Sequence, residues 1–183
     1  MNKNIKKQLN EIFTKQTFLI VSPAEHMTEN TNKITEYLVK DKHLTCIYVS
    51  INKPSKTIKA ELIKKRKLNA KKFYFVDAIT SAVTEPTEVK NTLYVSNPSD
   101  LDGIASSIGQ LAPIIGEDGF IIVDAMRTLL IYNSEQKISK FVESLILLEK
   151  KYRIKVLFMT TEGKGRSLIN KVNRYFEKVI ELK

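Results

Sequence analysis

Residues Gly119–Leu130 read Gly-Phe-Ile-Ile-Val-Asp-Ala-Met-Arg-Thr-Leu-Leu, and this stretch decides the fold class. Four apolar residues, three of them β-branched, precede the acid Asp124, which predicts a buried strand that ends at a carboxylate. A carboxylate at such a strand end can hold Mg²⁺ opposite a bound phosphate, or it can cap the helix that follows. This stretch alone leaves both roles open.

Six further runs of the same kind lie on either side of this strand. They are short and rich in Val, Ile, Phe and Tyr, and several are almost continuously apolar, as is typical of strands buried on both faces of a parallel sheet. The seven predicted strands are Phe18–Val21, Leu44–Ile51, Phe73–Val76, Thr92–Val95, Phe120–Val123, Val156–Met159 and Lys178–Leu182. The intervals predict helices over Asn4–Lys15, Asn30–Lys40, Pro54–Leu68, Ser99–Leu111, Glu135–Tyr152 and Ser167–Phe176.

The longest of these helices shows why the elements form layers. Apolar residues of Glu135–Tyr152 recur every three or four positions after Ser134, a typical N-cap. Strands that alternate with such helices predict an α/β three-layer sandwich with a mostly parallel central sheet, whose ligand crevice lies at the carboxyl ends of the strands. The sequence predicts a single domain over residues 1–183, with an N-terminal helix in 1–16, a core over 17–182 and an exposed loop at Val83–Asn91.

Composition excludes several classes of protein. The 183 residues are 43% hydrophobic and 27% charged, which fits neither a disordered nor a fibrous chain. Cys46 has no partner for an internal disulfide, and together with His26 and His43 it cannot complete a zinc site, so no metal is expected. No apolar run is long enough to cross a membrane, so we expect a cytoplasmic protein without membrane contact.

The positive charge is concentrated in the amino-terminal part of the chain. Residues 1–72 hold sixteen Lys or Arg against six Asp or Glu, whereas residues 73–183 are balanced. Lys53–Lys72 is the most basic segment, and it predicts either a solvated helix face or a contact with phosphates or an acidic partner. We favour the solvated face, because nucleic-acid binders usually combine lysines with Arg and aromatic residues.

A phosphate-binding loop is expected between the first strand and the next helix, where the chain reads Ser22-Pro-Ala-Glu-His-Met-Thr-Glu-Asn-Thr-Asn32. The spacing fits the eight-residue phosphate loop if Ala24 opens it and Thr31 closes it. Ala24 and Glu29 occupy the two glycine positions, and Asn30 occupies the position of the phosphate-binding Lys. Only Thr31 retains the expected residue type, that of the Mg²⁺-binding hydroxyl.

Three phrases in chain order resemble the KaiC-like branch of the RecA superfamily. They are Tyr48–Pro54 (Tyr-Val-Ser-Ile-Asn-Lys-Pro), Phe120–Ser134 and Leu157–Glu162 (Leu-Phe-Met-Thr-Thr-Glu), with Phe75–Ala78 between the first two. The resemblance covers residues 17–182 and implies the RecA-like core of P-loop NTPases. It also implies that the first strand lies beside Phe120–Val123, with Asp124 close to Thr31.

The departures from the family pattern imply an inactivated member. Asn52 and Lys53 stand where the family has paired glutamates, one of which activates the attacking water, and the chain ends before the family's basic terminal strands. We therefore expect no catalytic residue and no cofactor, although ATP with Mg²⁺ is possible. The vestigial nucleotide-binding positions are Ser22, Asn30, Thr31, Asp124 and Thr160. The resemblance further associates such inactivated domains with signalling in archaea and some bacteria.

Two classes of function remain open at this point. The first is a non-catalytic regulatory or protein-interaction domain with an unknown protein partner, as a monomer or homodimer. The second is nucleotide binding or weak hydrolysis through an unorthodox phosphate loop, and nucleic-acid binding could accompany the first. The residues that could contact an anion or partner are Lys53, Lys64, Lys65, Arg66, Lys164 and Arg166. Arg127 could pair with Asp124 and give that acid a structural role.

Overall fold

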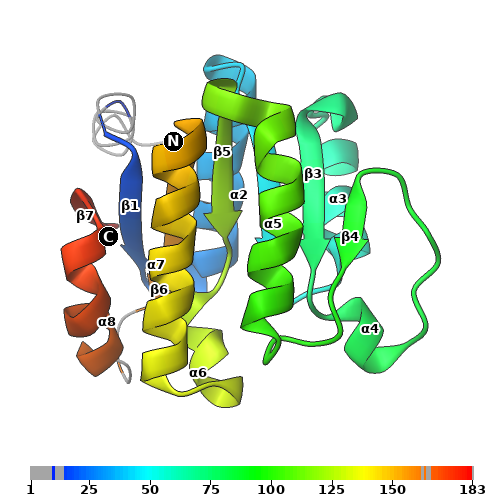
Figure 1. Ribbon diagram of the computed structural model, residues 1–183. Helices are drawn as coiled ribbons and strands as arrows, with labels where there is room; N and C mark the ends of the chain where they lie inside the picture. Colours follow the sequence, from blue (N-terminus) through cyan, green and yellow to red (C-terminus); the bar gives the residue numbers. More distant parts are fainter. Residues whose placement is uncertain (1–9, 11–14, 162, 164–165, 183) are drawn as a thin grey trace.

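The computed structural model describes residue 10, residues 15–161, residue 163 and residues 166–182 (Figure 1). Seven parallel strands form one sheet in the order β4-β3-β2-β5-β6-β1-β7. The strands are β1 (Thr17–Ser22), β2 (Thr45–Ser50), β3 (Phe73–Asp77), β4 (Thr92–Tyr94), β5 (Gly119–Val123), β6 (Lys155–Thr161) and β7 (Lys178–Glu181). All seven predicted strands are confirmed.

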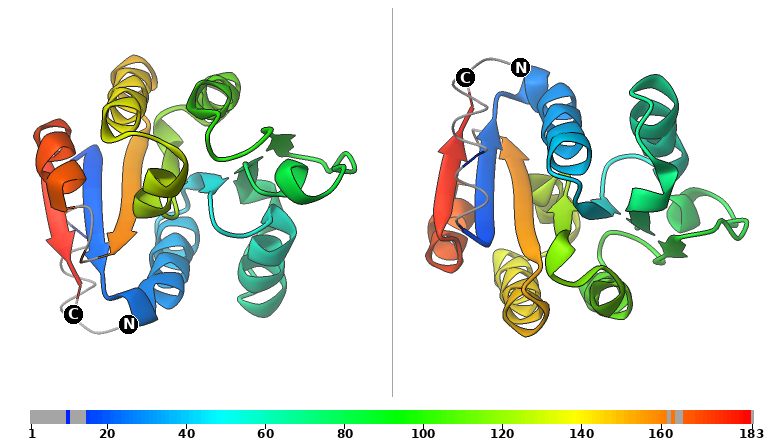
Figure 2. Two further views of the ribbon diagram at one scale, coloured as in Figure 1. Left: turned by 90° about the horizontal axis from the view of Figure 1, so that it is seen from below. Right: turned by 90° about the horizontal axis from the view of Figure 1, so that it is seen from above.

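Helices cover both faces of this sheet, which confirms the three-layer α/β sandwich (Figure 2). One face carries α2 (Met27–Glu36), its π-helical continuation η3 (Tyr37–Asp41), and α3 (Ser55–Lys59) with its continuation η4 (Ala60–Lys65). The other face carries α5 (Leu101–Ile115), α7 (Glu135–Tyr152) and α8 (Arg166–Val172). The short helices α4 (Thr80–Val83) and α6 (Leu129–Tyr132) lie among the connections. No helix of the described residues is long and apolar enough to span a membrane.

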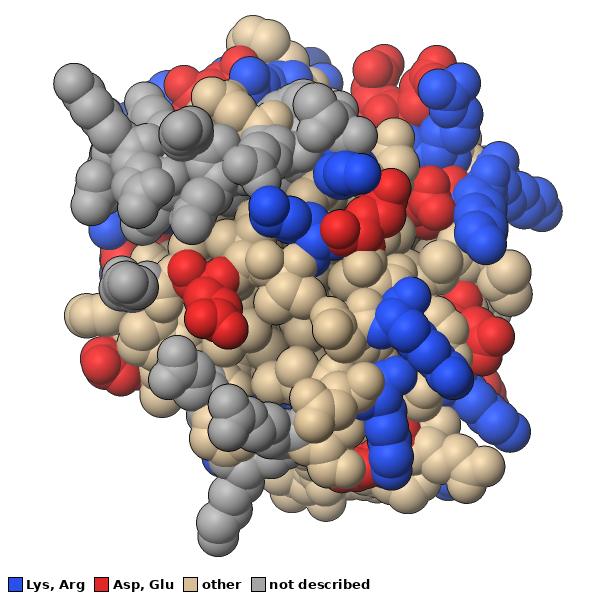
Figure 3. Space-filling view, turned by 90° about the vertical axis from the view of Figure 1, so that its left-hand side faces the viewer, with Lys and Arg blue, Asp and Glu red and all other residues tan. Residues whose placement is uncertain are grey.

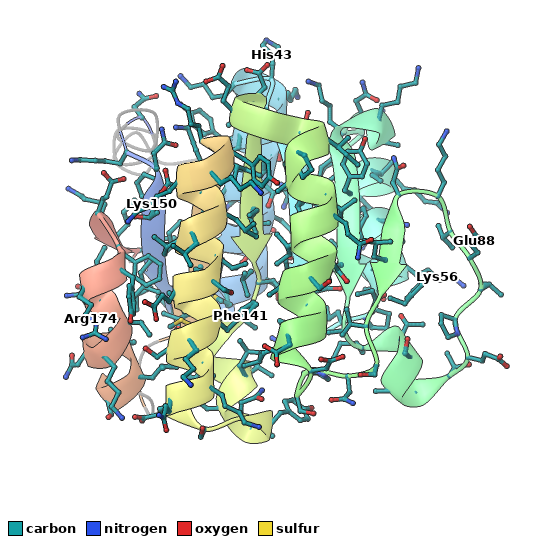
Figure 4. The ribbon with its side chains drawn as sticks, in the orientation of Figure 1. His43, Lys56, Glu88, Phe141, Lys150 and Arg174 are labelled. Carbon is teal, nitrogen blue, oxygen red and sulfur yellow. The ribbon has the colours of Figure 1, made fainter. Side chains whose placement is uncertain are left out.

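Two apolar cores lie on the two sides of the sheet because β1, β5 and β6 are buried on both faces. On the α7 side, the Phe158 ring makes edge contacts with Phe141 at 6.1 Å and Phe176 at 5.6 Å between ring centroids. Phe141 points inward from α7, whereas Lys150 of the same helix is exposed (Figure 4). The apolar periodicity predicted for α7 therefore faces the sheet.

Local signals explain where the helices begin and end. The Ser134 hydroxyl accepts from the Lys137 amide, which confirms it as the N-cap of α7, and Arg153 ends that helix with a left-handed φ of 56°. Asp100 caps α5 by accepting from the Gly103 amide at 2.8 Å. A Cβ at Gly103 would lie 2.3 Å from the Asp100 carboxylate, so a larger residue there would require the Asp100 side chain to shift. The predicted helix Asn4–Lys15 falls almost entirely outside the described residues.

The prediction that the first strand lies beside the Phe120–Val123 strand is wrong. β6 lies between β1 and β5, because Leu19 pairs with Phe158 while Val156 pairs with Ile121. The chain leaves β1 through α2 and enters the sheet at β2, two places beyond β6. After β5, the helix α7 leads into β6, which takes the position between β5 and β1. Right-handed crossovers allow this order, and residue patterns do not specify which gap a later strand fills.

Candidate functional site

The carboxyl ends of β1, β2, β5 and β6 meet at one edge of the sheet, near α6 at the bottom of Figure 1. Two of the cavities that the described residues line at this edge have volumes of about 520 Å³ and about 40 Å³. Met27 and Asn52 line both, so the cavities are neighbours. Asp124 and Thr31 line the smaller cavity, as predicted, while Thr160 lines the larger one. His43 lies at the opposite edge of the sheet (Figure 4).

The segment in the phosphate-loop position is closed by its own hydrogen bonds. Ala24–His26 form a 3-10 turn that runs directly into α2, and the amides of His26 and Met27 donate to the carbonyls of Pro23 and Ala24. The Thr31 hydroxyl, predicted as a Mg²⁺ ligand, donates to the Met27 carbonyl at 2.8 Å. These donors are used within the segment, so they do not form a cradle for a phosphate.

Asn30 and Ser22 close the same segment from inside. The buried Asn30 amide group donates to the Ser22 hydroxyl at 3.0 Å, and that hydroxyl donates to the Pro23 carbonyl at 3.2 Å. Asn30 stands where phosphate loops have their phosphate-binding Lys, and here its side chain bonds back to Ser22 at the end of β1. Both side chains therefore stabilise the turn after β1.

Asp124 is a buried carboxyl group at the end of β5. Its Oδ1 accepts from the Ile51 amide at 2.9 Å, and the Asp124 amide donates to the Val49 carbonyl at 3.2 Å. Burial raises the pKa of Asp124 to about 7, despite the opposing effects of the Ile51 hydrogen bond and the Lys53 charge. Burial and the nearby Asp124 carboxylate also raise the pKa of Tyr48 well above its ordinary value. Asp124 is therefore protonated more easily than an exposed aspartate.

Lys53 brings a cation to this edge, at the position where the KaiC-like proteins that the sequence resembles have a glutamate. Its ammonium group donates to the Thr28 hydroxyl of α2 at 3.3 Å, and both residues line the smaller cavity with Asp124. The neighbouring Asn52 is exposed. Neither side chain supplies the carboxylate that activates water in the family.

Asp77, at the end of β3, is a second buried acid, and no role was predicted for it from the sequence. Its two carboxylate oxygens accept from the amides of Ser55, Ile79 and Thr80 and from the Thr80 hydroxyl, at 2.7–2.9 Å. Although burial raises the pKa of Asp77, these hydrogen bonds outweigh burial and lower it overall. Asp77 thus fixes the starts of α3 and α4. The phrase Phe75–Ala78 was the available signal, but it does not reveal the donors.

Both apolar and polar side chains line the larger of these two cavities. Its lining residues are Met27, Asn52, Ala125, Arg127, Thr128, Leu130, Ile131, Glu135, Thr160 and Thr161. Ile131 and its neighbour Tyr132 are 75% and 48% exposed. Both belong to α6, and Ile131 lines the cavity.

Arg127 turns toward β6 rather than toward Asp124. Its Nη1 donates to the Thr161 hydroxyl at 3.0 Å, and a Cβ added at Gly163 would lie 3.3 Å from the same nitrogen. Among the described residues, no ion pair joins Arg127 to Asp124. The suggested structural pairing of these two side chains is therefore not made.

Within the basic segment Lys53–Lys72, the predicted surface helix covers Ser55–Lys65, with Ile58 and Leu62 turned inward, and residues 66–69 are not helical. Several of its cations have protein partners. Arg66 pairs with Glu36 at 2.7 Å and Glu29 at 2.6 Å, and Lys65 pairs with Glu61. Lys64 is exposed. Lys164 and the side chain of Arg166 lie outside the described residues.

On the face that carries α8, basic and acidic residues are interspersed around a neutral centre (Figure 3).

Several solved structures share the fold of this chain. Among solved structures, a KaiC-like protein from the hyperthermophilic archaeon Pyrococcus horikoshii OT3 is 12% identical with a TM-score of 0.63, covering 91% of this chain and 70% of that one. An uncharacterized Pyrococcus horikoshii protein in complex with an unknown peptide is 15% identical with a TM-score of 0.69, covering 92% and 78%. A third solved structure, described as an ATPase domain, is 12% identical with a TM-score of 0.60, covering 92% and 69%.

These similarities show that the fold is that of RecA-like P-loop ATPase domains. No curated protein matches the chain. A family model described as a family of unknown function, DUF7090, matches residues 4–183. The chain is therefore a member of this family of unknown function, built on a RecA-like core.

Proposed function

We propose that this chain is a RecA-like domain that does not hydrolyse nucleotides and acts as a regulatory module that binds a protein partner. The observation that carries the proposal is the closed segment after β1, where Asn30 bonds to Ser22 and Thr31 bonds to the Met27 carbonyl. One structural neighbour is described in complex with an unknown peptide, which supports the choice of a protein partner. A role in signalling remains part of this proposal.

The chemistry of phosphoryl transfer also supports the proposal. Hydrolysis depends on positioned cations, Mg²⁺ and a group that orients the attacking water. Here Asn30 replaces the lysine, Asn52 and Lys53 replace the glutamates, and the Asp124 carboxyl faces a cavity of about 40 Å³. A space of this volume holds about one water molecule and no triphosphate.

Phosphate release from ATP and GTP with Mg²⁺ tests this proposal. We expect background rates for the natural chain, and the same rates for Asp124→Ala and for Asp118→Ala, an exposed control. Turnover above background in the natural chain that disappears in Asp124→Ala but persists in Asp118→Ala would refute the proposal.

A second candidate function, nucleotide binding without hydrolysis, rests on Lys53. Its ammonium group lies 3.3 Å from the Thr28 hydroxyl and beside Asp124, so it could replace the missing phosphate-binding lysine if the Ser22–Thr31 segment opened. Contact with nucleic acid through Lys64 and its exposed neighbours is a further proposal. It is less favoured, because Arg66 and Lys65 are held by glutamates.

A further inference from the structure

We infer that the exposed side chains of Lys64, Lys67 and Lys71 form a docking surface for an acidic segment of a partner protein. This inference rests on the proposed function, because it names the chemistry of the proposed partner. For these lysines it replaces the solvated helix face that the sequence favoured. The three residues, the lysine surface, lie around the end of η4 and the turn before β3, at the amino ends of the strands and opposite to the two cavities (Figure 1).

The lysine surface belongs to the most basic part of the chain. Residues 61–72 hold six Lys or Arg against the single acid Glu61. All three lysines of the surface are exposed, and none of them forms an ion pair with an acid among the residues that the structure describes. Their positive charge is therefore open to the carboxylates of another molecule.

The neighbouring cations bind carboxylates and hold this surface in place. Arg66 binds Glu36 at 2.7 Å through Nη1 and Glu29 at 2.6 Å through Nη2, and its side chain is only 21% exposed. These two ion pairs fix the end of η4 against α2. Lys65 pairs with Glu61 at 2.9 Å. The segment thus divides into cations that bind the chain's own acids and lysines that face outward without one.

The backbone conformation of Lys67 is a second observation that assigns a ligand to this surface. Lys67 follows η4 with a left-handed φ of 54°, a conformation that favours glycine. Arg153 has the same conformation after α7, but its side chain pairs with Glu117 at 3.7 Å. The exposed charge of Lys67 favours the helix dipole only weakly. A lysine therefore stands at a glycine-type position without an acidic partner in the described part of the chain.

The composition of the segment favours carboxylates over nucleic acid. Nucleic-acid sites usually add aromatic side chains that stack on bases and Arg side chains that bind phosphates. Residues 53–72 contain no aromatic residue, and Arg66, the only Arg among them, is held by two glutamates. Lysine ammonium groups act as point charges on flexible side chains, which suits the carboxylates of an acidic polypeptide.

Calorimetric titration with decaglutamate tests the inference, with decaglutamine and an oligothymidylate of the same charge as comparison ligands. We expect decaglutamate to bind at least about tenfold more tightly than decaglutamine, and more tightly than the oligothymidylate. The double variant Lys64→Glu/Lys67→Glu should weaken this binding at least about tenfold. Lys137→Glu/Lys140→Glu, an equal change of charge at two exposed positions of α7, should alter it less than about twofold.

Lys67→Gly separates binding from stability. The change removes one charge and replaces a left-handed lysine by the residue that this conformation favours. We therefore expect weaker binding of decaglutamate together with an unfolding midpoint in urea that is not lowered. Binding equal to that of the natural chain would contradict the role assigned to Lys67.

Three results would overturn the inference: no saturable binding of decaglutamate, an equal loss in the two double variants, or tighter binding of the oligothymidylate. The second result would show an attraction that follows net charge alone, and the third would show a nucleic-acid surface. Unfolding curves establish that each variant is folded, and Lys67→Gly serves if the double variant is not. Failure of the proposed function would appear separately, as nucleotide turnover in the phosphate-release assay, which does not depend on decaglutamate.

Discussion

Asp124→Asn is expected to raise the free energy of unfolding at pH 8 by on the order of 4 kcal/mol, because about 1.4 kcal/mol accompanies each unit of pKa difference. Burial raises the pKa of Asp124 from 3.8 to about 7 in the folded chain. Asparagine has nearly the same shape, retains the oxygen that accepts from the Ile51 amide at 2.9 Å, and carries no charge to bury.

The direction of the pH dependence of stability follows from proton binding to Asp124. Between about pH 4 and pH 7 the folded chain holds a proton on Asp124 that the unfolded chain has released, so the stability contribution of this group is complete below pH 4 and is lost as the pH rises to about 7. Denaturant unfolding at pH 5 and pH 8 should therefore show a fall in stability that is absent from Asp124→Asn and still present in the exposed control Asp118→Asn. A destabilised Asp124→Asn at pH 8 would contradict the assignment of a buried carboxyl group whose ionised form is disfavoured.

Asp77→Asn is expected to have the opposite effect, lowering the free energy of unfolding at pH 7 by about 3 kcal/mol. An amide nitrogen in place of Oδ2 cannot accept from the Ser55 amide or the Thr80 hydroxyl, and it turns a donor toward both. Because hydrogen bonds lower the pKa of Asp77, its contribution is present above pH 4 and lost in acid.

Matched urea unfolding curves of Asp77→Asn and Asp124→Asn measure this contrast between two similar strand ends. Unchanged stability of Asp77→Asn at pH 7, or a loss of equal size in both variants, would show that the hydrogen bonds of Asp77 are not what separates the two acids.

Burial patterns made most of the fold predictable. Continuous apolar runs such as Phe120–Val123 identify strands covered on both faces, and the spacing of Ile58 and Leu62 identifies the buried side of a basic helix. Such patterns indicate only whether each residue is buried or exposed. They carry no information on strand order, which is why the position of β6 between β1 and β5 was missed.

The candidate site was only partly predictable for a similar reason. Motif spacing located Thr31 and Asp124 at one cavity, because the ends of parallel strands share an edge. The hydrogen bond from Arg127 to Thr161 and the one from the Ser55 amide to Asp77 join residues distant in sequence. Their geometry depends on side-chain directions that only the folded chain fixes. The predicted roles of Ser22 and Thr160 in nucleotide binding remain predictions.

The central claim is that the segment after β1 is closed to nucleotides, and calorimetric titration with Mg·ATP tests it most directly. We predict no saturable heat up to millimolar nucleotide, and correspondingly no thermal stabilisation, although a bound ligand at 100 times its dissociation constant would add about 2.7 kcal/mol. Saturable one-to-one binding that is lost in Lys53→Ala or Asp124→Ala, but retained in the exposed control Lys150→Ala, would contradict the claim and favour nucleotide binding through Lys53.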